Sequence, residues 1–255
     1  MNVDKASSIN RIKIGWKLRH LVILITAGLG TYLFVKSRIG WSEMHLWNRA
    51  VGDMGLVLIA SSIVLGPLAR LWKMFRITLP WRRECGIYGV LLAIIHTVII
   101  LDSWIKWDLA QIFGYMLHPQ TAQYVMLLHG FGLANVIGIV ALMYGMVLAV
   151  TSNDWSQQKL SGSVWKYLQQ GVYVLWMLVV IHTGYFLYIH FQDFHKEVPD
   201  PNWAQLPFAV LVGIVISLQL AAFLKTWKTK QSSHVTADPG LQEIVNIPVS
   251  NAVKN

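Results

Sequence analysis

Two histidines lie inside long apolar stretches of the sequence, and their type and position suit them to bind a metal. His96 lies in GIYGVLLAIIHTVIIL, and His182 lies in the apolar stretch from Val164 to His190, VWKYLQQGVYVLWMLVVIHTGYFLYIH. An ionisable side chain at membrane depth costs a few kcal/mol unless another group binds it. Iron coordination is one interaction that would satisfy a neutral imidazole, so the interpretation depends on whether the two histidines face each other across a heme.

The composition indicates an integral membrane protein. The chain has 255 residues, of which 55% are hydrophobic and 13% charged, and its mean hydropathy is +0.49. Soluble domains carry about 25% charged residues. The net charge of +9 does not indicate nucleic-acid binding, because the basic residues cluster beside the apolar stretches. Cys85 is the sole cysteine, so an internal disulfide and a Cys-x-x-Cys motif are excluded.

The apolar stretches predict an all-α membrane protein, a six-transmembrane helix bundle over residues 21–224. The expected spans are Leu21–Val35, Ala50–Ala69, Glu84–Leu101, Tyr124–Val150, Val164–Tyr188 and Leu206–Leu224. An interfacial helix is expected in the outer loop between the third and fourth spans. Residues 1–20 form a basic cytoplasmic N-terminus, and the polar cytoplasmic tail 225–255 is predicted to be disordered.

The lysines and arginines predict the orientation of the bundle. Fifteen of them lie beside the spans on the side of the N-terminus, and five lie on the other side. The positive-inside rule therefore places both termini in the cytoplasm. In this topology His96 and His182 lie about 8–12 Å below the outer boundary of the hydrocarbon core, since each is a few residues from the outer end of its span.

A third histidine, His129, enters the fourth span at the same depth. The alternative for each of the three is a core histidine bonded to a helix carbonyl or a serine, and for His129 this alternative is favoured. The other six histidines are most simply solvated or interfacial: His20, His45, His118, His190, His195 and His234.

Several motifs in order resemble the ferric reductase-like transmembrane domain family, and within it the heme-binding membrane subunits of a bacterial methionine sulfoxide reductase system. The resemblance covers residues 50–190. It rests on the turn Gly66-Pro67-Leu68-Ala69-Arg70, on Arg82-Arg83 followed thirteen residues later by His96, and on Thr151-Ser152-Asn153-Asp154-Trp155 with Leu160, Trp165, Leu168 and Tyr173 after it.

The resemblance implies a b-type heme between the third and fifth spans, with His96 and His182 as the outer axial ligands. Where the family often has a second histidine, thirteen residues before the last one, this chain has Gln169, and glutamine is a poor iron ligand. One heme is therefore expected. The resemblance also implies a flavin mononucleotide (FMN) on the inner side, where Arg82 and Arg83, with Lys73 and Lys166, form a basic rim; Arg82 and Arg83 are candidate flavin or propionate contacts. Ordinary positive-inside charge is the simpler explanation of that rim.

The predicted function is that of a b-type cytochrome, the electron-transfer subunit of an oxidoreductase in the bacterial inner membrane. Its donor would be a cytoplasmic flavin/NAD(P)H reductase or a membrane quinol. Its acceptor would be an outer-side reductase subunit, ferric iron or oxygen. Two alternatives stay open: a quinol-linked cytochrome b anchor, with His129 as a quinone contact, and a non-heme transporter or assembly factor with the same bundle.

Overall fold

The structure is a computed structural model that describes residues 15–126, 129–190 and 202–237. Six helical segments in this part of the chain are long and apolar enough to cross a membrane, which confirms the predicted six-span helical bundle. They are α1 (Trp16–Lys36), α2 (Glu43–Leu71), α3 (Trp81–Ile99) with the π-helix η2 (Ile100–Trp104), α4 (His129–Val150), the consecutive α6 (Gly162–Gln170), α7 (Val172–Gly184) and η4 (Tyr185–Ile189), and α8 (Gln205–Ala237).

The short elements lie between the spans. They are the 3-10 helices η1 (Lys73–Thr78) and η3 (Leu109–Phe113), helix α5 (Asp154–Lys159), and an antiparallel hairpin of β1 (Tyr115–Leu117) and β2 (Tyr124–Met126). The fourth span was predicted to begin at Tyr124, but Tyr124 pairs with Leu117 in the hairpin, since aromatic and β-branched residues suit a strand. The outer loop, where an interfacial helix was expected, contains the five-residue 3-10 helix η3. The Tyr124 hydroxyl donates to Asp108, whose carboxylate raises the pKa of Tyr124 by disfavouring the phenolate.

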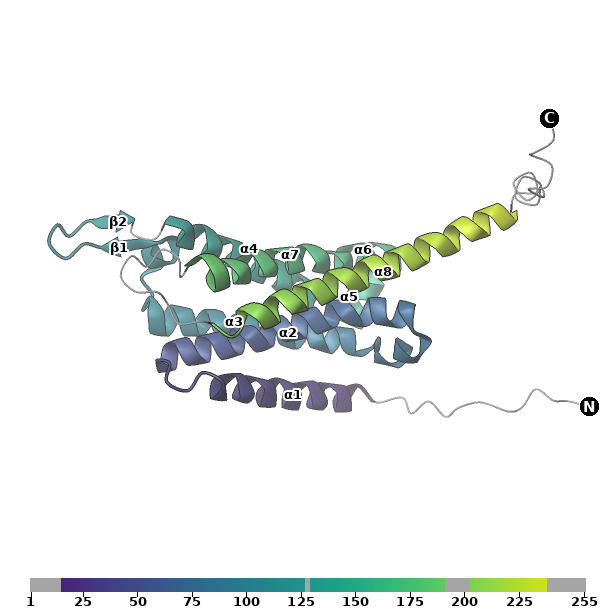
Figure 1. Ribbon diagram of the computed structural model, residues 1–255, viewed down its shortest axis with the longest axis horizontal. Helices are drawn as coiled ribbons and strands as arrows, with labels where there is room; N and C mark the ends of the chain where they lie inside the picture. The colour runs from purple at the N-terminus through teal and green to yellow at the C-terminus, as the bar shows by residue number, and fades with distance from the viewer. Residues whose placement is uncertain (1–14, 127–128, 191–201, 238–255) are drawn as a thin grey trace, which may run out of the picture.

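The six spans run along one long axis, with the hairpin projecting from one end (Figure 1). Helix α1 begins, and α8 ends, at the opposite end. We call these the hairpin end and the terminal end. Helix α2 is the most buried span and packs against α1, α3, α7 and α8. Residues on α2 are therefore the ones that several other spans can reach.

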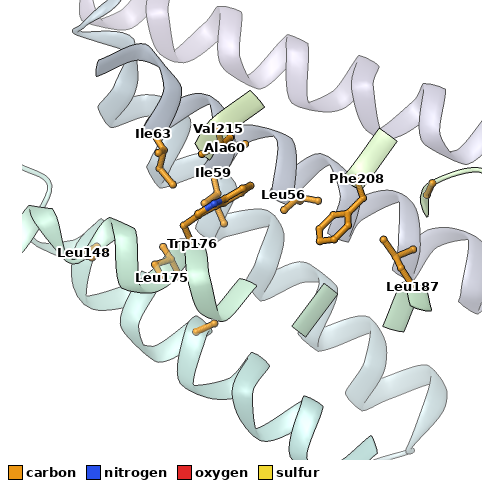
Figure 2. Packing of buried hydrophobic residues seen from close by; sticks show 12 residues of the cluster. Leu56, Ile59, Ala60, Ile63, Leu148, Leu175, Trp176, Leu187, Phe208 and Val215 are labelled. Carbon is orange, nitrogen blue, oxygen red and sulfur yellow. The ribbon is translucent and has the colours of Figure 1, made fainter. Parts of the chain in front are cut away.

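The main core lies where α2, α4, α7 and α8 meet. Figure 2 shows Trp176 on α7 directed toward Ile59 on α2, with Leu148 of α4 and Val215 of α8 in the same cluster. A second cluster joins α1 to α2 and α3 through Ile23, Ala27, Met54, Leu58 and Cys85. Van der Waals packing stabilises these buried contacts, since lipid is as apolar as the side chains and gives no hydrophobic driving force.

Polar contacts fix the outermost helices to the rest of the bundle. Arg19 on α1 forms an ion pair with the buried Glu84 on α3, with 2.8 Å between Nε and Oε1. On α8, the Lys225 ammonium donates to the carbonyl oxygens of Arg70 and Leu71 at the end of α2, at 3.0 and 2.8 Å. These contacts satisfy charges and backbone acceptors that lipid could not.

Helix α8 is longer than expected, because it runs to Ala237 whereas the predicted span ends at Leu224. Residues 225–237 are thus helical, and the prediction of a disordered tail was wrong for this stretch. The helix continues because extending an existing helix adds one hydrogen bond for each residue and requires no new nucleus. Residues 238–255 lie outside the described part of the chain, as do residues 1–14.

Candidate heme site

His96 is held at the hairpin end of α3 by a contact with α2. Its Nδ1 lies 2.9 Å from the backbone carbonyl oxygen of Asn48. A carbonyl oxygen can only accept, so Nδ1 carries the proton and Nε2 keeps the lone pair. The contact therefore selects the tautomer in which Nε2 can bind a metal.

His182 has the same arrangement on another pair of helices. Its Nδ1 lies 2.8 Å from the backbone carbonyl oxygen of Ala134, so α7 is tied to α4 as α3 is tied to α2. The same reasoning leaves Nε2 of His182 available as a ligand. The two imidazoles, on two different helix pairs, are thus held in the same tautomer, with Nε2 able to bind a metal.

A glycine sits four residues after each carbonyl and makes room for the ring. A Cβ on Gly52 would lie 3.0 Å from Nδ1 of His96, and a Cβ on Gly138 would lie 2.6 Å from Nδ1 of His182. In an α-helix the carbonyl of residue i faces residue i+4, so a side chain there would cover the oxygen. Glycine leaves the second lone pair of that oxygen open to the imidazole.

The two arrangements are related by a constant offset in the sequence. Gly52 and Gly138, like His96 and His182, are 86 residues apart, and so are the carbonyl residues Asn48 and Ala134. Both histidines also lie in an Ile-His-Thr triplet. The bundle thus contains two similar helix pairs, α2 with α3 and α4 with α7, each presenting one histidine.

Both histidines line one cavity of about 340 Å³ in the hairpin half of the bundle. This volume lies within the range of cofactor-sized sites. The lining is largely apolar and comes from α2, α3, α4 and α7; it includes Leu56, Val90, Leu142, Leu175 and Val179. The arrangement can hold a flat, largely apolar group with an imidazole presented from α3 and another from α7.

Aromatic rings surround the hairpin end of the cavity. Phe186 lies 5.0 Å from His182 and 5.7 Å from Phe131, centroid to centroid, and Phe131 lies 5.1 Å from Trp104. His190 packs on both phenylalanines at 5.4 Å and is only 9% exposed. The expectation that His190 is solvated was therefore wrong, because its ring packs against Phe131 and Phe186 and lines the cavity. These rings exclude water from the site.

A group of charged side chains lies beside the cavity. Arg38 is buried and forms an ion pair with Asp53, and its guanidinium lies 4.9 Å from the ring centroid of Trp203. Arg49 and Asp53 both line the cavity, and the Arg49 guanidinium lies 5.8 Å from the ring centroid of Phe186. Two cations and one anion give this group a formal charge of +1. Such an excess in a low-dielectric setting favours an anionic ligand.

The structure places the other predicted site residues elsewhere. Arg82 is at the first turn of α3, fourteen residues before His96, and donates from Nε to the Ser62 carbonyl at 2.9 Å. Arg83 is more exposed and forms an ion pair with Asp154 at 2.8 Å. The structure therefore does not bring the two together in one site, and neither lines the histidine cavity. His129 begins α4, and its side chain lies outside the described part of the structure.

Gln169, at the position where a second histidine would be expected, takes part in hydrogen bonds to the loop after α4. Its Nε2 lies 3.1 Å from Thr151 Oγ1, and its Oε1 accepts from Ser152 at 3.3 Å. Both ends of the Gln169 amide are hydrogen-bonded in this network, and the side chain links α6 to the loop. The only histidines lining the cavity among the described residues are His45, His96, His182 and His190.

The sequence reasoning missed Gly52, Gly138 and Arg49. The two glycines carried a signal, because each precedes its histidine by 44 residues and the same 86-residue offset relates both pairs. Arg49 was counted only as one of the five basic residues on the outer side. Its placement beside the cavity depends on the rotation of α2, which the sequence pattern did not define.

A multi-pass helical bundle with paired, pre-oriented histidines around an apolar cavity defines a class of membrane proteins that hold a cofactor between their helices. The chain belongs to the family described as ferric reductase like transmembrane component, whose family model matches residues 50–180. It is a multi-pass bacterial membrane protein of this family. The matched region includes His96 and Ala134, whereas Asn48 lies two residues before it and His182 two residues after it.

Named relatives match over most of the chain. The chain is 26% identical to the "Protein-methionine-sulfoxide reductase heme-binding subunit MsrQ" of Bordetella parapertussis over 224 residues, which are 87% of this chain and 93% of the relative. It is 25% identical to the protein of the same name from Rhodospirillum rubrum over 189 residues, which are 73% of this chain and 78% of the relative. Both relatives are named as heme-binding subunits.

Proposed function

We propose that the protein is a membrane electron-transfer subunit that holds one b-type heme between His96 and His182. The observation that carries the proposal is the matched pair of imidazoles on α3 and α7. Each has its Nδ1 bonded to a backbone carbonyl, each keeps Nε2 for a metal, and both line one cavity. A bound heme supplies a one-electron iron couple.

The residues around the cavity fit such a group. The glycines at 52 and 138 leave the space that the two rings need in order to reach their carbonyls. A bound heme carries two anionic propionates, and the excess positive charge of Arg38, Arg49 and Asp53 beside the cavity would attract them. Arg49 is therefore the residue proposed to hold a propionate, in preference to Arg82 and Arg83 at the other end of α3.

The protein's own residues set the conditions for electron transfer. The two carbonyl contacts hold the imidazoles in one tautomer and one orientation, which reduces the rearrangement needed when the charge at the metal changes. The aromatic rings of Trp104, Phe131 and Phe186 keep water away from the site. This favours a carrier of electrons over a site where oxygen or water reacts.

We infer the partners from the topology and from the names of the relatives. The relatives are subunits of a protein-methionine-sulfoxide reductase, so the proposed acceptor is a reductase subunit on the outer side. The proposed donor is FMN or a membrane quinol on the cytoplasmic side. With FMN, a cytoplasmic flavin reductase would be a further partner, because the described chain offers no nucleotide-binding domain of its own.

The decisive experiment measures heme in the purified protein. A reduced-minus-oxidised spectrum should have the sharp bands of a low-spin b-type cytochrome, and the pyridine hemochrome assay should give about one heme per chain. His96→Ala and His182→Ala should each abolish the low-spin spectrum. His20→Ala is the matched control, because His20 packs on Tyr88 at 5.7 Å and does not line the cavity. A folded but colourless protein would contradict the proposal and favour the non-heme alternative.

A further inference from the structure

A second recess lies at the terminal end of the bundle, far from the histidines. It has a volume of about 310 Å³ and is formed where the end of α2 and η1 meet α8. Its lining residues are Arg70, Arg76, Lys225, Thr226, Thr229 and Lys230. We call it the basic recess.

The fold, rather than local sequence, brings these cations together. Arg70 and Lys225 are 155 residues apart, yet Lys225 donates to the Arg70 carbonyl at 3.0 Å. Lys225 thus caps the carbonyl end of α2 and fixes α8 beside it. With α8 fixed, Lys230 lies in the same recess as Arg70 and Arg76.

The charge of the basic recess is entirely of one sign. Four of its six lining residues are cations, and the other two are threonines; among the described residues, no Asp or Glu lines it. The neighbouring positive charges of Arg70, Arg76 and Lys225 repel one another, and an anion among them would reduce that repulsion. A tetrahedral phosphate suits them, since guanidinium and ammonium groups donate several hydrogen bonds to its oxygens.

Exposed aromatic side chains lie close in the sequence to the residues that line the recess. Trp72 follows the end of α2 and is 49% exposed, while Phe223 and Trp227 flank Lys225 on α8 and are 63% and 54% exposed. Aromatic residues beside basic ones are typical of the level where lipid headgroups meet acyl chains. Exposed aromatic residues on the elements that form the recess are consistent with a phosphate that carries hydrocarbon chains.

We propose that the basic recess binds the phosphate group of an anionic phospholipid such as phosphatidylglycerol. Basic pockets between transmembrane helices on the cytoplasmic side are suited to acidic headgroups. The same recess could take free inorganic phosphate, which shares the chemistry but lacks the acyl chains. The lipid would join α2 to α8 at the end of the bundle opposite the heme site, so this site does not depend on heme binding.

Native mass spectrometry of the delipidated full-length protein tests the proposal. In one arm the protein is titrated with phosphatidylglycerol or phosphatidylcholine, and in the other with inorganic phosphate. We expect phosphatidylglycerol to bind more tightly than phosphatidylcholine. Arg70→Gln and Arg76→Gln should each weaken that binding about fivefold, because one cation near an anionic membrane surface contributes an affinity of about that factor.

Lys166→Gln is the matched control, because it removes one exposed charge from α6 and does not line the recess. Lys225 is left unchanged, since its loss would also uncap α2. Binding of inorganic phosphate that depends on Arg70 and Arg76, without a preference for phosphatidylglycerol, would support the phosphate site and overturn the lipid as its source. Equal weakening by Lys166→Gln, or unchanged binding in both arginine variants, would overturn the site itself.

Discussion

Gly138→Ala is a small change that tests whether the Nδ1 contact with the Ala134 carbonyl orients His182 for heme binding. The new Cβ would lie 2.6 Å from Nδ1 of the ring, about 0.8 Å closer than the 3.4 Å at which ordinary contact begins. His182 would have to leave the Ala134 carbonyl, which costs about 1 kcal/mol for the hydrogen bond. A strained rotamer adds about 1 kcal/mol.

Together these costs predict that heme binds about 30-fold more weakly to Gly138→Ala than to the wild type. The helix itself should not suffer, because alanine is favoured over glycine within helices by about 1 kcal/mol. The assay is a heme titration of the apoprotein followed by absorbance, with thermal unfolding as the check on folding. A smaller loss of the same kind is expected for Gly52→Ala, where the Cβ would lie 3.0 Å from His96.

Gly213→Ala is the matched control. Gly213 lies within α8, and a Cβ there would meet nothing within 4 Å. It should bind heme like the wild type and be equally or more stable. If Gly138→Ala bound heme as tightly as Gly213→Ala, with an unchanged spectrum, the inferred role of the glycine and of the Nδ1 contact would be refuted.

Three further predictions concern the cavity and its surroundings. Arg49→Gln should lower the heme midpoint potential by about 40 mV, measured by redox titration. The reason is that a nearby cation disfavours the oxidised, more positive iron by about 1 kcal/mol, and the substitution removes that cation. An unchanged or raised potential would contradict the propionate assignment. Gln169→His should leave about one heme per chain in the pyridine hemochrome assay. It should also lower the free energy of unfolding by about 1 kcal/mol, because the hydrogen bond to Thr151 is lost. A ratio near two hemes per chain would contradict the single site. His129→Ala should keep the low-spin spectrum, and its collapse would make His129 a ligand in place of His96 or His182.

The sequence was sufficient to predict the class of fold and the residues proposed as ligands. Apolar stretches of about 20 residues identify spans because backbone groups in lipid must bond within a helix. The six spans are present, and His96 and His182 line one cavity, as their equal depth suggested. Depth could be predicted because a helix rises by a fixed 1.5 Å per residue.

The orientation of the termini, one heme rather than two, and the FMN site remain predictions. The sequence was less informative at the element ends. Tyr124–Met126 is a strand and α8 continues to Ala237, since hydropathy alone does not distinguish a short apolar strand from the start of a span or mark where an extended helix stops.

Side-chain contacts across the bundle were decided only by the tertiary structure. The sequence determined that His96 and His182 lie within apolar stretches long enough to span a membrane. It did not determine that each ring bonds to a backbone carbonyl 48 residues away, in a space left open by a glycine. Nor did it determine that Arg70 meets Lys225. These contacts depend on how each helix is rotated about its axis and which neighbour it packs against. Rotation and neighbour are set by the close packing of all six spans at once, whereas hydropathy is a property of each span alone.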